Sequence, residues 1–94
     1  MNVVQENDFR FLIWDFGANY RAACRAKSAA DMLNKLKIVE EEGDETLYWL
    51  ELLKESKSAP DAVLDPLIKE TDEIVAMTVA SIKTIKSKIQ NQRT

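Results

Sequence analysis

Apolar residues recur at helical spacing along most of this chain. Between residues 32 and 53 they alternate in steps of four and three, which is the heptad rhythm of a helix that packs along one side. The seam consists of Met32, Leu36, Val39, Gly43, Thr46, Leu50 and Leu53. It predicts a long helix over about residues 29–55, in which Gly43 allows a partner helix to come close.

The N-terminal segment carries a similar apolar stripe. Its large members follow i, i+3, i+4, i+7 spacing and are Phe9, Leu12, Ile13 and Phe16. Alanines at positions 18, 22 and 26 predict that this helix covers about residues 9–27, with the alanine row as its packing face. Ser28 is a suitable N-cap for the next helix. The break is weakly encoded, so one continuous helix is the alternative.

This first segment is apolar on more than one side. Phe11 and Trp14 lie off the stripe, and a helix of this kind needs more than one neighbour to cover it. Gly17 costs about 1 kcal/mol in a helix interior relative to alanine, which predicts a close backbone approach or a local bend there.

The C-terminal third predicts another helix, over about residues 60–90. Its sevenfold row is Ile68, Val75, Ile82 and Ile89. Thr71 and Thr78 flank this row. Pro60 fits the start of a short helical turn, and Asp65 followed by Pro66 is a second start signal, because proline is tolerated at the first helical position.

Composition agrees with an all-α fold. The 94 residues are 46% hydrophobic and 31% charged, and they include only two Gly and two Pro. A β-sandwich of this length needs several turns, which these residues usually form. We therefore expect one all-α domain spanning residues 1–94.

The sequence favours a cytoplasmic protein that does not contact a membrane. The start, MNVVQENDF, lacks the basic and apolar regions of a secretory signal. The most apolar stretch, FRFLIWDFGA, is short and is interrupted by Arg10 and Asp15. Cys24 is the single cysteine, so an intrachain disulfide is impossible and a reducing compartment is the simpler expectation.

The residue types offer little for catalysis. The absence of histidine removes the commonest general base and metal ligand. Cys24 in an alanine-rich segment is typical of a small packed residue rather than a nucleophile. The acidic run EEEGDE, residues 40–45, is a cation site in one interpretation and a solvated or ion-paired helix face in the favoured one. We expect no enzymatic activity, no cofactor or metal, and no small-molecule substrate.

Charge is arranged in blocks, although the net charge is only −3. Residues 20–37 hold five basic residues against one acid, and residues 40–55 hold seven acids against one lysine. The basic residues are candidates for contact with RNA or DNA, namely Arg21, Arg25, Lys27, Lys35 and Lys37. A pI near 4.9 argues against strong nonspecific binding by a monomer. In the alternative, Arg21 and Arg25 pair with Glu41, Glu45 or acids of another copy, and the protein is purely an assembly module.

Aromatic residues supply the candidate interface. Tyr48 and Trp49, in TLYWLELL, lie beside the heptad seam rather than on it. Large aromatic side chains in such positions are common anchors of protein interfaces. Phe11 and Trp14 belong to the same candidate set.

Two stretches resemble a known protein family. GANYRAACRAKSAADMLNKLKIVEEEGDETLYWLELL, residues 17–53, resembles the signature of the bacterial four-helix-bundle proteins encoded by intervening sequences in 23S rRNA genes. DEIVAMTVASIKTIK, residues 72–86, resembles the last helix of that family. The family-like positions of the first stretch are Gly17, Ala18, Asn19, Arg21, Cys24, Arg25, Lys27, Asp44, Glu45, Leu47, Tyr48, Trp49 and Leu50.

The resemblance implies an up-and-down bundle of the four-helix-bundle type and a homo-oligomer, a pentamer, with no assigned enzymatic activity. A related branch, the accessory protein of diversity-generating retroelements, implies a surface that handles nucleic acid. Two departures matter. Gly43 stands where the family usually has alanine, and the helix that the family carries before Gly17 is short or missing here. We expect three main helices, with the vacant side of the bundle covered by another subunit.

Overall fold

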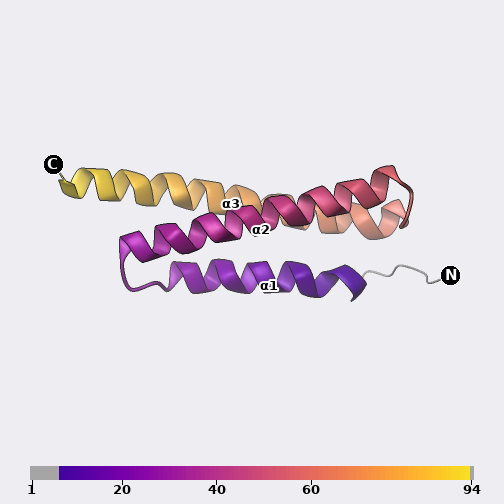
Figure 1. Cartoon of the computed structure of the whole chain (residues 1–94), viewed down its shortest axis with the longest axis horizontal. Coiled ribbons are helices and arrows are strands. Elements are labelled where there is room, and N and C mark those ends of the chain that lie inside the picture. The colour runs from indigo at the N-terminus through magenta and orange to yellow at the C-terminus, as the bar shows by residue number, and fades with distance from the viewer. Residues whose placement is uncertain (1–6, 94) are drawn as a thin grey trace.

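The computed structural model describes the backbone of residues 7–93 and the side chains of Arg10 and residues 13–92. Three helices make up this part of the chain: α1 (Asn7–Cys24), α2 (Ala29–Glu55) and α3 (Asp61–Arg93). They run in alternating directions and form an elongated body of 59 × 20 × 15 Å (Figure 1). The predicted all-α class is confirmed.

The turn between α1 and α2 separates two helices, so the continuous-helix alternative is wrong. The Ser28 side chain accepts a hydrogen bond from the Asp31 N–H at 3.1 Å, and the extended backbone of Ser28 interrupts the helical path. The predicted N-cap is thus confirmed. The first helix ends at Cys24 rather than near residue 27, because the Arg25 and Ala26 N–H groups already bond three residues back, to the carbonyls of Ala22 and Ala23.

The end of α2 is built without glycine. The Ser58 N–H bonds to the Leu53 carbonyl and the Lys57 N–H to the Lys54 carbonyl, which together form a Schellman motif. This motif requires a left-handed residue, and here Lys57 adopts φ 56°. A side chain at this position carries a steric cost that glycine does not.

The third helix begins at Asp61, and the second predicted start at Asp65–Pro66 is wrong. Pro66 lies inside the helix, at an exposed position of its second turn. The Lys54 ammonium donates to the Asp65 carboxylate and ties the end of α2 to the beginning of α3. This hydrogen bond to Asp65 raises the pKa of Lys54 above its ordinary value.

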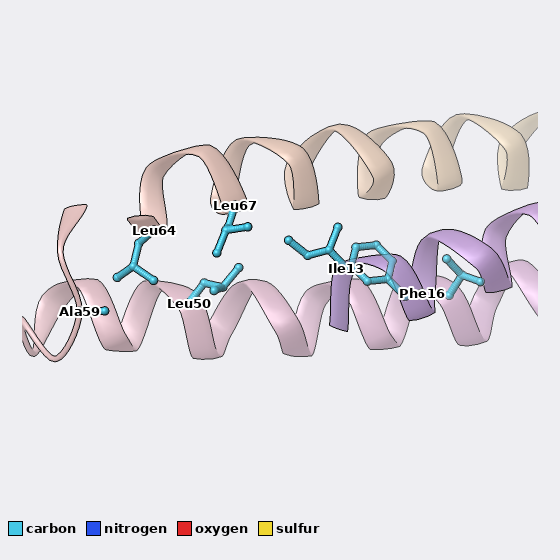
Figure 2. Close-up of a cluster of buried hydrophobic side chains, with 7 residues drawn as sticks. Ile13, Phe16, Leu50, Ala59, Leu64 and Leu67 are labelled. Atoms are coloured by element: carbon cyan, nitrogen blue, oxygen red, sulfur yellow. The ribbon is translucent and has the colours of Figure 1, made fainter. Parts of the chain in front are cut away.

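The core lies along the inner sides of all three helices. In one cluster, Ile13 and Phe16 of α1 meet Leu50 of α2 and Leu64 and Leu67 of α3 (Figure 2). A second cluster, nearer the α1–α2 turn, contains Ala23, Leu36, Ile82 and Ile85. Every position of the predicted α2 seam is buried or half-buried, so the heptad assignment is confirmed.

Two threonines occupy the centre of the α3 packing side, although the apolar pattern placed them at its flank. Thr71 and Thr78 are fully buried. Their hydroxyl groups donate to the carbonyls of Leu67 and Ile74, each at 2.7 Å. The bonds satisfy the buried hydroxyls, so threonine can occupy the core at little polar cost.

The alanine row of α1 is not its packing face within the chain. Ala18 and Ala22 are exposed, whereas Ala23 is fully buried. The inward row continues from Phe16 through the half-buried Tyr20 to Ala23, at steps of four and three. The predicted packing face is therefore wrong, because the row of alanines lies beside the row that faces the core.

The two glycines have different environments. A Cβ atom on Gly43 would lie 2.6 Å from Cγ2 of Val75 on α3, so the close approach predicted there is confirmed. A Cβ atom on Gly17 would lie 3.8 Å from Cδ1 of Ile74, which is ordinary van der Waals contact. The close approach expected at Gly17 is therefore absent.

We predict that Gly43→Ala lowers the free energy of unfolding by about 1–2 kcal/mol. The clash with the stiff Val75 side chain costs more than the gain in helix propensity returns. Urea unfolding followed by circular dichroism, at one fixed protein concentration, measures the change. In a Val75→Ala background the clash disappears, so there Gly43→Ala should be neutral or stabilising. An equal loss in both backgrounds would contradict the proposed contact.

We predict that Lys57→Gly raises the free energy of unfolding by about 0.5–1 kcal/mol, because it relieves the left-handed strain. Ser56→Gly is the matched control. Ser56 has ordinary right-handed angles, φ −79° and ψ −5°, so glycine there relieves no strain. It only raises the conformational entropy that the chain loses on folding, which lowers the stability. Thermal unfolding of both variants should therefore shift in opposite directions.

Candidate functional site

A groove lies between α1 and α3, and we call it the α1–α3 groove. It has a volume of about 530 Å³. Trp14, Ala18 and Arg21 form its α1 wall, and Ile74 and Met77 form its α3 wall. Trp14 is 68% exposed and Met77 is 49% exposed, so large apolar side chains stand uncovered on both walls.

Two side-chain bonds cross the groove and hold its walls together. Arg10 of α1 forms an ion pair with Glu70 of α3. Further along, the hydroxyls of Tyr20 and Ser81 lie 3.0 Å apart within hydrogen-bond distance. The helices α1 and α3 are therefore fixed relative to each other, although they share fewer contacts than either shares with α2.

The candidate interface residues divide between two surfaces. Trp14 faces solvent at the α1–α3 groove, while Tyr48 and Trp49 are exposed on α2. The Tyr48 and Trp49 rings meet edge to face, with centroids 5.3 Å apart and planes at 74°. The side chain of Phe11 lies outside the described residues. Each of these three candidates, Trp14, Tyr48 and Trp49, is more than half exposed, as an interface anchor would require in a single copy.

Alternating helix directions gather the basic residues at one end of the bundle. The α1–α2 turn and the C-terminal end of α3 lie at the same end (Figure 1). Arg21, Arg25 and Lys27 are exposed there, as are Lys83 and Lys86 of α3. No acidic residue follows Glu73 in the sequence, so α3 adds only positive charge to this end. The basic segments can be recognised in the sequence, but only the fold shows that they lie at the same end of the bundle.

The remaining basic candidates are less available. Lys35 is exposed but forms an ion pair with Asp31 at 3.1 Å, one turn earlier on α2. Lys37 is exposed on the same helix. Lys35 therefore contributes less free charge than Arg21 or Arg25.

The intrachain ion pairs of the alternative hypothesis are not formed. Among the side chains that the structure describes, Arg21 and Arg25 contact neither Glu41 nor Glu45. Glu42 instead accepts a hydrogen bond from the Asn19 amide at 3.3 Å, which links α2 to α1. Both arginines thus present their charge outward.

The structure also bears on a metal site, on Cys24 and on membrane-spanning helices. Within the described part of the chain, no group of three or more His, Cys, Asp or Glu residues is arranged to hold a metal ion. Cys24 is exposed, so its interpretation as a packed residue is wrong; the adjacent Ala23 takes the inward position. No described helix is long and apolar enough to cross a membrane.

Comparison with protein-family models, with curated proteins and with solved structures gives no match. The resemblance to the 23S rRNA intervening-sequence proteins therefore stays a prediction from the sequence.

Proposed function

We propose that this chain is a cytoplasmic, non-enzymatic protein of the four-helix-bundle type that assembles with copies of itself. The observation that carries the proposal is the uncovered α1–α3 groove with Trp14 and Met77 on its walls. The resemblance to the 23S rRNA intervening-sequence family supports it and favours five copies.

The geometry explains why a further helix suits this position. In a four-helix bundle each helix has two close neighbours. Here α2 packs against both other helices, whereas α1 and α3 share fewer contacts with each other. A further helix packed between α1 and α3 gives each of the four helices two close neighbours. Exposed apolar surface of this kind marks an interaction site in a folded protein.

We expect size-exclusion chromatography with light scattering at micromolar concentration to give a mass several times the 10.7 kDa of the monomer. Met77→Lys places a charge in the groove and should shift the protein toward the monomer. Ser87→Lys, at an exposed α3 position away from the groove, is the matched control and should leave the mass unchanged. A parent protein that is helical, melts cooperatively and remains monomeric would refute self-assembly.

The basic end of the bundle favours a second candidate function, binding of RNA. Arg21 and Arg25 are exposed and carry no carboxylate partner among the described side chains, and α3 places Lys83 and Lys86 at the same end. Each phosphate that such a residue neutralises releases counterions and strengthens binding at low salt. Assembly multiplies weak contacts of this type.

We predict that the parent binds a labelled RNA hairpin at low salt and that Arg25→Ala with Lys27→Ala, both at exposed positions of the basic end, weakens this binding. The slope of log K against log salt should become shallower by about 1.5, because two phosphate contacts are lost. Fluorescence anisotropy over a salt series measures both quantities. Lys57→Ala with Lys69→Ala removes the same charge far from the basic end and should change little. Absence of binding at low salt would eliminate RNA and leave the assembly module.

A further inference from the structure

A second exposed apolar surface lies on α2, apart from the α1–α3 groove. We call it the α2 face and define it by Ile38, Glu42, Glu45, Trp49 and Leu52, which recur at steps of three and four and so share one side of the helix. Ile38 is 55% exposed and Trp49 is 54% exposed. Ile38 and Glu42 also line a shallow groove against Asn19 and Ala22 of α1.

The α2 face and the α1–α3 groove are complementary in charge. Beside the apolar wall of the groove stands Arg21, which is exposed and has no carboxylate partner among the described side chains. Between the apolar ends of the α2 face stand Glu42 and Glu45. A contact between two grooves would bring like arginines together and would leave the α2 face uncovered. A contact between a groove and an α2 face covers both surfaces and pairs opposite charges.

The spacing of these residues also matches. Seven residues separate Trp14 from Arg21 on α1, which is about 10.5 Å along a helix. Seven residues also separate Trp49 from Glu42, and seven separate Ile38 from Glu45. When Trp14 lies against either apolar end of the α2 face, Arg21 therefore reaches a carboxylate. The exposed Ala18 lies between Trp14 and Arg21 and lets the two helices approach closely.

We propose that the α1–α3 groove of one copy binds the α2 face of the next copy, so that the interface is heterologous rather than self-paired. This inference rests on the proposed self-assembly and specifies its surfaces. A heterologous contact uses different patches on the two partners, so each copy can bind one neighbour through its groove and another through α2.

The test uses two variants that each block one surface. Met77→Lys blocks the groove and keeps the α2 face, whereas Trp49→Lys blocks the α2 face and keeps the groove. Each variant alone should be monomeric by light scattering, while Ser87→Lys assembles like the parent. An equimolar mixture of the two blocked variants should form a 1:1 complex of about twice the monomer mass, because one intact groove meets one intact α2 face. Circular dichroism spectra and melting curves establish that both variants are folded.

Charge reversal within this mixed complex tests the ion pair. Arg21→Glu, added to the Trp49→Lys chain, should raise the dissociation constant about tenfold at low salt. Glu42→Lys with Glu45→Lys, added to the Met77→Lys chain, should recover most of that loss when the two reversed chains are mixed. Recovery is specific to the pairing of these surfaces, since each reversal alone weakens binding.

The outcomes separate the two levels of the proposal. Assembly of Trp49→Lys as large as that of the parent, together with no 1:1 complex in the mixture, means that the groove pairs with itself. That result overturns the heterologous contact and leaves self-assembly intact. A monomeric parent overturns both.

Discussion

The contact between Gly43 on α2 and Val75 on α3 sets the spacing of the two long helices, and the position of α1 depends on it. Because Gly43 has no side chain, Val75 occupies the space beside it, and a ring atom of Phe16 lies within 3.6 Å of where a Cβ atom would stand. Phe16 thereby brings α1 into the angle between α2 and α3. Thr71 and Thr78 are fully buried on the neighbouring part of α3, where their hydroxyls bond to the helix backbone.

The uncovered groove follows from the way in which α1 is held. Its inward row of Ile13, Phe16 and Ala23 is buried in the shared core, yet the helix carries apolar surface on a second side as well. On that second side, Trp14 lines the groove and is 68% exposed, and no described helix covers it. The bonds from Arg10 to Glu70 and from Tyr20 to Ser81 fix the helix in place without covering it. The groove is therefore a stable feature of the folded chain.

Much of this architecture could be predicted from periodicity, because a heptad seam such as that of α2 must face a partner. The Ser28 cap could be predicted as well, because an N-cap depends only on the local sequence. Burial of Thr71 and Thr78 could not, since their polarity hides the core row until the backbone bonds are known. Exposure of Ala18 and Cys24 was also missed, because alanine and cysteine suit inner and outer positions equally. For the site, the charge blocks were visible in the sequence, but their gathering at one end depends on the order and direction of three helices.

That gathering connects the two candidate functions. One end of the bundle is basic, and the acids of residues 40–73 lie from its middle toward the opposite end, so each copy is polar along its long axis. Copies that stand parallel bring their basic ends together into one extended positive surface, which strengthens attraction to phosphate over the reach of about 10 Å that salt allows. Copies that stand antiparallel place each basic end beside an acidic one and cancel that field. Arg21 reaches a carboxylate of the α2 face in either orientation, so the groove contact alone does not choose between them. In the proposed assembly, the direction in which neighbouring copies point therefore decides whether the basic ends form one RNA-binding surface or the assembly is a purely structural module.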